Sequence, residues 1–331
     1  MRLPYPALLA ALGLAGALLF LASLLVGPAA IGLSDSLAAL FHGQGEAVTL
    51  VMREVRLPRA ILGAAIGAAL GLSGALLQGL LRNPLAEPGL IGTSSSAALG
   101  AVLAIQTGVS AAFALALPLA ALAGALASVA VLLLLSGPRG STLTLILAGI
   151  GISSLATATT ALILNLSPNP FAANEIIFWM MGSLADRSML HVQLALPFLG
   201  LGALLAVPAA RSLDALTLGE DAAASMGVNL RRLRLLTVLA AALMVGAATA
   251  VAGAVGFVGL VVPHLLRRAC DARPSRLLAA SALGGAAVVL AADVAVRLIA
   301  PDRDLKLGVL TAIVGAPFFL HLIVRTRQEG L

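Results

Sequence analysis

Charge is scarce in this sequence. Of its 331 residues, 10% are Asp, Glu, Lys or Arg, whereas 60% are hydrophobic. A soluble domain carries about 25% charged residues, so the composition excludes an ordinary soluble fold. No Asp, Glu, Lys, Arg or His occurs from Leu3 to Ser34 or from Pro88 to Pro138. Apolar runs of this length are long enough to cross the roughly 30 Å hydrocarbon core of a bilayer as helices.

Cysteine and aromatic residues are also rare. The single Cys270 cannot form an internal disulfide, and we interpret it as a structural thiol beside Arg267 and Arg268 in a cytosolic loop. Aromatic residues make up 3% of the chain and basic residues are scattered among its loops, so no stacking surface for nucleic acid is expected despite a net charge of +6. We attribute the charge to the basic bias of cytosolic loops.

Lysine occurs once, as Lys306, between Leu305 and Leu307. A P-loop needs Gly-Lys followed by Ser or Thr, because the lysine and the hydroxyl reach the phosphates and Mg²⁺. The chain is therefore not expected to bind ATP, and an ATP-driven role would require a separate subunit. His-Glu-x-x-His and Gly-x-Ser-x-Gly are absent too, so the sequence predicts no enzyme active site.

Ten apolar segments are predicted to span the membrane, because a helix pairs all of its own backbone groups in lipid. They are 6–26, 58–81, 90–106, 113–135, 142–164, 190–207, 234–252, 255–267, 276–297 and 307–324. The expected fold is an all-α polytopic membrane protein, with residues 1–331 in one transmembrane domain. Segment 255–267 is the shortest, and its loss would reverse the orientation of its neighbours.

Ten spans place both termini on one side of the membrane. In that arrangement thirteen basic residues lie on the side of the termini and seven on the other, together the 20 of the chain. The positive-inside rule then predicts cytosolic termini. The first apolar stretch, from Pro6 to Val26, is longer than the 7–15 residues of a signal-peptide core, so we expect an uncleaved span.

Glycines recur at helical spacing in the second span and again around the seventh. Spacing of three to four residues places them on one helix face, where small residues let two backbones approach closely. The two spans enter from opposite sides, which suggests a weak inverted repeat of spans 2–5 and 7–10. The glycines are Gly63, Gly67, Gly71 and Gly74, then Gly246, Gly253, Gly256 and Gly259.

Titratable side chains are nearly absent from the spans, and Asp293 is the exception. Arg297 follows it by one helical turn, and a carboxylate–guanidinium pair at this spacing neutralises both groups. We favour this structural pair over the alternative, a proton relay of an ion-coupled secondary transporter. His191, His264 and His321 are far apart in the sequence, so neither a metal site nor a bound cofactor is expected.

The longest predicted cytosolic loop, about 208–233, contains signals for well-capped helices. Glu220 and Asp221 would stand in a first turn, where acids complement the helix dipole. Gly227 suits a left-handed helix end, and Asn229 is a good N-cap for the next helix.

Residues 218–229 are therefore expected to form a compact knob, with Ala223 and Met226 exposed. A knob of this kind favours docking to a partner over the alternative, a solvated connector.

Six motifs, in order from about residue 50 to the C-terminus, resemble the permease family of vitamin B12, ferric-siderophore and haem importers. The resemblance is specific for the family and not for one substrate. The motifs are Arg56-Leu57-Pro58-Arg59, 73–79 (SGALLQG), 82–89 (RNPLAEPG), 218–228, 259–264 (GLVVPH) and 308–319.

The resemblance implies a homodimer in the bacterial inner membrane, two cytosolic ATPase subunits that bind ATP and Mg²⁺, and a periplasmic substrate-binding protein. The function it implies is import of a ferric siderophore, haem or cobalamin. It makes the knob the element that couples to the ATPase. The coupling residues would be Leu218, Gly219, Glu220, Asp221, Ala223, Met226 and Gly227.

Two further sites follow from the resemblance. Arg56, Arg59 and Arg297 match positions that pair with acidic residues of the binding protein, and the alternative is interfacial anchoring together with the Asp293 pair. The segment around Trp179 matches a short outer helix near the dimer axis. The cytosolic gate residues would be Asn83, Leu85, Ser141 and Thr142.

Overall fold

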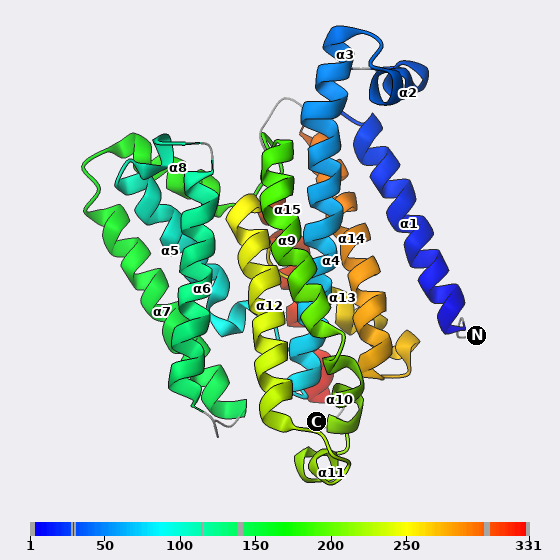
Figure 1. The fold of residues 1–331 in the computed structure, drawn as a ribbon, viewed down its shortest axis with the longest axis vertical. Coiled ribbons are helices and arrows are strands. Elements are labelled where there is room, and N and C mark those ends of the chain that lie inside the picture. The colour runs from blue at the N-terminus through cyan, green and yellow to red at the C-terminus, as the bar shows by residue number, and fades with distance from the viewer. Residues whose placement is uncertain are drawn as a thin grey trace.

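The computed structural model describes residues 4–27, 29, 31–113, 115–137, 142–300 and 305–328, and all regular structure in these ranges is helical. The long helices form one bundle, with short helices at both of its ends (Figure 1). The long helices are α1 (Tyr5–Leu25), α4 (Leu57–Leu80), α6 (Ala116–Ser136), α7 (Thr142–Asn165), α9 (Met189–Ala206), α12 (Leu230–Ala252), α14 (Pro274–Ile299) and α15 (Leu307–Gln328).

Each of the ten predicted spans coincides with a helix. Within the described ranges, seven helices are long and apolar enough to cross a membrane, including the continuous helical run Glu46–Leu80. The other three predicted spans correspond to α5 (Thr93–Gln106), α13 (Val258–Leu266) and α15, whose apolar part is Leu307–Leu322. The membrane fold is thus confirmed in outline, and the count of ten crossings stays a prediction.

Several helices lie outside the predicted spans. At one end are α2 (Leu33–His42) and α8 (Pro170–Met180), together with α3 (Glu46–Leu50) and the π-helix η1 (Val51–Arg56), which run continuously into α4. At the other end are α10 (Ala209–Leu216) and α11 (Glu220–Ser225). The 3₁₀ turns are η2 (Pro88–Ile91), η3 (Val109–Ala111) and η4 (Arg267–Cys270).

The centre of the bundle is built on α4 and α12. In the most apolar stretch of α12, 78% of the residues are buried, against 17% in α1 and in α7. One flank consists of α5, α6 and α7, and the other includes α14 and α1 (Figure 1). Large leucines of α1 and α7, such as Leu14 and Leu155, therefore remain exposed at the surface of the bundle.

The glycines of α4 pack as the sequence predicts, but the second set does not share one helix face, because Gly253 and Gly256 lie in the non-helical connection between α12 and α13. A side-chain carbon added at Gly67 or Gly71 would overlap backbone of α14, and one added at Gly74 would overlap the carbonyl of Gly259 in α13. An added carbon at Gly246 would lie 2.7 Å from Cβ of Ala125 in α6. Gly256 is packed less closely, because a carbon added there would have its nearest neighbour, an oxygen of Glu87, at 3.8 Å.

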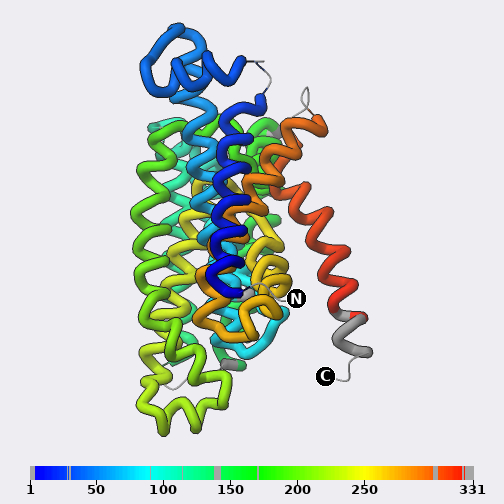
Figure 2. The backbone as a smooth tube through the Cα atoms, turned by 90° about the vertical axis from the view of Figure 1, so that its right-hand side faces the viewer, coloured from blue at the N-terminus to red at the C-terminus, as the bar shows by residue number. Residues whose placement is uncertain are grey.

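The start of α1 and the described end of α15 lie toward the end of the bundle that carries α11 (Figure 2). Tyr5 fixes the first of these, because its hydroxyl donates to the carbonyl of Arg276 at 3.0 Å. We call the α11 end the inner end and the α2 and α8 end the outer end, following the predicted orientation.

We expect Gly74→Ala to destabilise the bundle by about 3 kcal/mol, because a methyl group would push α4 away from α13. Gly200→Ala in α9 is the matched control, since nothing described lies within 4 Å of the added carbon. The midpoint of thermal unfolding of the purified chain should fall by at least about 5 °C for the first variant. Equal midpoints for the two variants would contradict this packing.

Candidate functional site

The knob at the inner end has the caps that its sequence predicts. Glu220 and Asp221 stand in the first turn of α11. Gly227 has a φ of +86° at the turn that ends this helix, and the amide of Val228 closes the turn by donating to the carbonyl of Ala223 at 3.0 Å. The side chain of Asn229 accepts from the amide of Arg232 at 2.9 Å and so caps α12.

One expectation about the knob is wrong. Ala223 is fully buried, because its face of α11 packs inward on the bundle. Met226 is 63% exposed, as expected, and Leu218 is 68% exposed. The apolar surface of the knob is therefore made by Leu218 and Met226, which flank α11 on either side.

An ion pair fastens α11 to the first turns of α12. A carboxylate oxygen of Glu220 lies 2.8 Å from a guanidinium nitrogen of Arg234. Arg234 belongs to the long central helix, so the pair joins α11 to the centre of the bundle. The motif 218–228 contains Glu220 but not Arg234. The two residues are 14 positions apart and lie on different helices, so no helical repeat in the sequence links them.

The helix α10 connects the knob to α4 and α14. Leu213 is fully buried, and its side chain lies at 3.3 Å from a carbon added at Gly79 of α4. Asp214 accepts from the amide and the hydroxyl of Ser275 at 2.8 and 2.6 Å, which caps the start of α14. These two contacts join α10 to both helices.

The predicted gate is brought together only in part. Asn83 and Leu85 share a turn after α4, in which the Asn83 side chain accepts from the Leu85 amide at 2.9 Å. Ser141 lies outside the described residues, and of Thr142 the structure gives only its place at the start of α7. A gate of these four residues stays a prediction.

Polar residues that the sequence reasoning missed tie this turn to α13. The side-chain amide of Gln78 donates to the carbonyl of Leu260 at 3.2 Å, and its oxygen accepts from Arg267 at 2.7 Å. Glu87 accepts from the amide of Phe257 at 2.9 Å, where the left-handed φ of +66° begins α13. Gln78 and Glu87 both lie within the motifs that resemble the family. Their place in these motifs was the sequence signal by which they could have been found.

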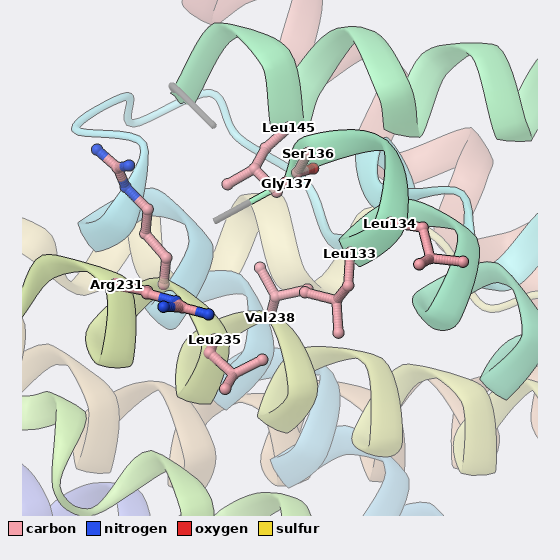
Figure 3. A pocket seen from close by; sticks show the side chains of 9 residues that line it. Leu133, Leu134, Ser136, Gly137, Leu145, Arg231, Leu235 and Val238 are labelled. Carbon is pink, nitrogen blue, oxygen red and sulfur yellow. The ribbon is translucent and has the colours of Figure 1, made fainter. Parts of the chain in front are cut away.

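A groove of about 330 Å³ lies beside the knob, between α12 and the inner ends of α6 and α7. Figure 3 shows leucines of α6 and α7 on one side and Leu235 and Val238 of α12 on the other, with Arg231 at the rim. Most of its lining is apolar, and Arg231 and Arg234 are the charged members.

The outer end contains the predicted pair of Asp293 and Arg297, 2.7 Å apart. Arg59 of α4 adds a second guanidinium at 2.8 Å, with its Nε within 3.1 Å of both carboxylate oxygens. Asp293 is 1% exposed. A carboxylate held by two guanidinium groups is an ion cluster that locks α4 to α14.

Arg56 and Arg297 also cap α1. Arg56 is 4% exposed and donates to three carbonyls, while Arg297 donates to two carbonyls and a hydroxyl. Positive charge at a helix C-terminus satisfies its free carbonyls and complements its dipole. The described structure thus uses all three predicted docking arginines internally, and contact with a binding protein stays a prediction. The acceptors are Ser23, Leu24, Leu25, Val26 and Ala29.

The remaining titratable candidates have structural surroundings. His191 accepts from the amide of Ser188 in a capping box of α9, and the His264 ring lies edge-on to Phe318. Among the described residues, no three of His, Cys, Asp and Glu are grouped so as to hold a metal. Cys270 is buried, and burial together with Asp271 raises the pKa of its thiol, so the reactive thiolate is disfavoured.

Comparisons with known proteins agree on one family. The FecCD transport family matches residues 14–325. The hemin transport system permease protein HmuU of Yersinia pestis is 38% identical over 318 residues, which cover 94% of this chain and 95% of that protein. The Fe(3+) dicitrate transport system permease protein FecD of Escherichia coli is 39% identical over 278 residues, covering 84% and 86%.

Two further matches are a cobalamin permease and a solved transporter structure. The cobalamin import system permease protein BtuC of Halobacterium salinarum is 37% identical over 286 residues, covering 86% of this chain and 76% of that protein. Among solved structures, an inward-facing conformation of a metal-chelate type ABC transporter superposes with a TM-score of 0.86 at 31% identity, covering 97% and 99% of the two chains.

We expect Asp293→Asn to destabilise the chain by about 3–5 kcal/mol, because two buried guanidinium groups would then face each other without an anion. Asp35→Asn on the exposed α2 is the matched control, with an effect within about 0.5 kcal/mol. Thermal unfolding of the two purified variants measures the difference. If Asp293→Asn and Asp35→Asn unfolded at similar midpoints, Asp293 would not be the group that holds the ion cluster together.

Proposed function

The chain belongs to the FecCD transport family, and we propose that it is the membrane subunit of an ATP-driven importer. It would pass a ferric siderophore, haem or cobalamin from a periplasmic binding protein to the cytosol across a bacterial inner membrane. The names of its relatives, which include hemin, Fe(3+)-dicitrate and cobalamin permeases, support this range of cargo.

The main support for the proposal is the knob, residues 218–229. It exposes Leu218 and Met226 on either side of the short helix α11, and Glu220 ties this helix to Arg234. An exposed apolar pair on a braced helix suits a cleft in a partner, and here the partner is one ATPase subunit of a pair. ATP and Mg²⁺ would be bound there and not by this chain.

The proposed movement runs from the knob into the bundle. Closure of the ATPase pair displaces α11, and the Glu220–Arg234 pair shifts α12 along the groove beside α6. Leu213 and Asp214 of α10 carry the same displacement to α4 and α14. The turn with Asn83 and Leu85, fixed to α13 through Glu87, then opens or closes the inner end.

The assembly follows from the family resemblance. Two copies of the chain would form the pathway between them, with both termini in the cytosol. The binding protein would dock on the outer end, where Arg59 is the most exposed of the three arginines at 17% of its side chain. Docking there would compete with Asp293 for the guanidinium group.

An ion-coupled secondary transporter is the alternative. It requires a titratable group that exchanges protons or ions within the membrane. The candidate, Asp293, lies in a cluster with Arg59 and Arg297, which opposes that role.

Met226→Glu is expected to abolish ATP-dependent uptake, because a charge at the apolar contact would oppose docking to the ATPase. Met226→Leu, which keeps the apolar surface, should retain most of the activity. The measurement is cargo uptake by proteoliposomes that contain the chain, its ATPase and its binding protein, with ATPase association followed in parallel. Uptake without ATP, or normal uptake by Met226→Glu, would refute the proposal.

A further inference from the structure

The groove between α12 and the inner ends of α6 and α7 changes from charged to apolar along its length. One face of α12 lines it, at spacings of three and four residues, with Arg231, Arg234, Leu235 and Val238. Arg231 stands in the first turn of α12, and Val238 lies about 10 Å further along the helix axis. The groove therefore runs from a charged mouth at the inner end to an apolar floor (Figure 3).

The walls and floor of the groove consist mainly of leucine and valine. Leu134 of α6 is 81% exposed, whereas Leu145 of α7 and Val238 are buried. All three residues belong to predicted spans, so we expect hydrocarbon and not water at this depth. A groove left empty there would lose dispersion contacts along its lining, and a lipid tail restores them.

The mouth of the groove is positively charged. Arg231 and Arg234 are the charged residues in the described lining, which contains no acid. Arg234 binds Glu220 at 2.8 Å, whereas the exposed Arg231 forms no hydrogen bond or ion pair with the described residues. The helix dipoles add to this charge, because both α7 and α12 begin at the mouth and only α6 ends there.

Depth and charge together define the class of ligand. A soluble anion would make no use of the leucine walls, and an uncharged lipid would make no use of the guanidinium group. Basic pockets between membrane helices on the cytosolic side attract anionic headgroups. A phospholipid with an anionic headgroup fits both the charged mouth and the apolar floor.

We propose that this groove binds an anionic phospholipid of the inner leaflet, with its phosphate at Arg231 and one acyl chain between α6 and α12. The headgroup would lie next to the Glu220–Arg234 pair that fastens the knob. The inference goes beyond the proposed function, and its test needs neither ATP nor cargo.

Native mass spectrometry of the purified full chain measures the lipid that it retains. The chain in detergent is titrated with palmitoyl-oleoyl phosphatidylglycerol, and phosphatidylcholine with the same acyl chains is the uncharged comparison. We expect one saturable site, with a Kd for phosphatidylglycerol at least about fivefold lower than that for phosphatidylcholine. Glycerol phosphate, which has the anionic group without the tails, should not displace the lipid.

Two matched pairs of variants locate the site. Arg231→Gln should raise the Kd for phosphatidylglycerol about fivefold, whereas Arg232→Gln, which removes the same charge outside the lining, should change it less than about twofold. Leu235→Ala should raise the Kd severalfold because it removes part of the apolar wall. Leu201→Ala in α9, similarly exposed but outside the groove, should leave the Kd unchanged. Unfolding midpoints close to that of the unmodified chain show that the four variants are folded.

The inference is overturned if the two lipids bind equally well, if Arg231→Gln and Arg232→Gln have the same effect, or if glycerol phosphate displaces the lipid. The same spectra separate monomers, dimers and complexes with the ATPase. Loss of phosphatidylglycerol in the dimer or in the ATPase complex would assign the groove to a protein contact, and the lipid site would then be wrong.

Discussion

The close approach of α4 to α14 and α13 is the constraint on which the rest of the structure depends. In lipid, helices gain little from burying apolar side chains against each other, so backbone proximity and polar pairs must hold them. Gly67, Gly71 and Gly74 supply the first along the middle of α4. The polar pairs lie at its two ends, with Arg59 to Asp293 outside and Gln78 to Leu260 inside. The helix α4 thus joins the ion cluster at the outer end to the turn of Asn83 and Leu85 at the inner end.

That arrangement explains how a movement at one end acts at a distance. Rigid elements with polar contacts at their ends transmit a displacement, whereas loosely packed surfaces absorb it. At the inner end α10, α11 and the start of α12 are joined by a few specific contacts, and a groove lies next to α12. At the outer end the ion cluster of Arg59, Asp293 and Arg297 holds α4 against α14.

The sequence predicted what depends on local chemistry. Apolar length gave the helices, glycine spacing gave the packing faces, and the Gly227 and Asn229 signals gave the ends of the knob helices. It could not give contacts between distant segments: Arg59 and Asp293 are 234 positions apart. The exposure of Ala223 was predicted wrongly because a short helix of mixed polarity shows no clear inward face in its sequence. The helices α2 and η1 were not predicted because their region has no strong apolar signal.

The capping of α1 has a consequence for the biogenesis of the protein. Its C-terminal carbonyls are satisfied by Arg56 and by Arg297, and the bond from Arg297 to Ser23 closes a loop of 274 residues. The ribosome delivers the first span long before the last partner for its end exists. The carbonyls of Ser23 and Val26 must therefore stay hydrated, in the translocon or at the lipid interface, until nearly the whole polypeptide has been inserted and Arg297 can bind them.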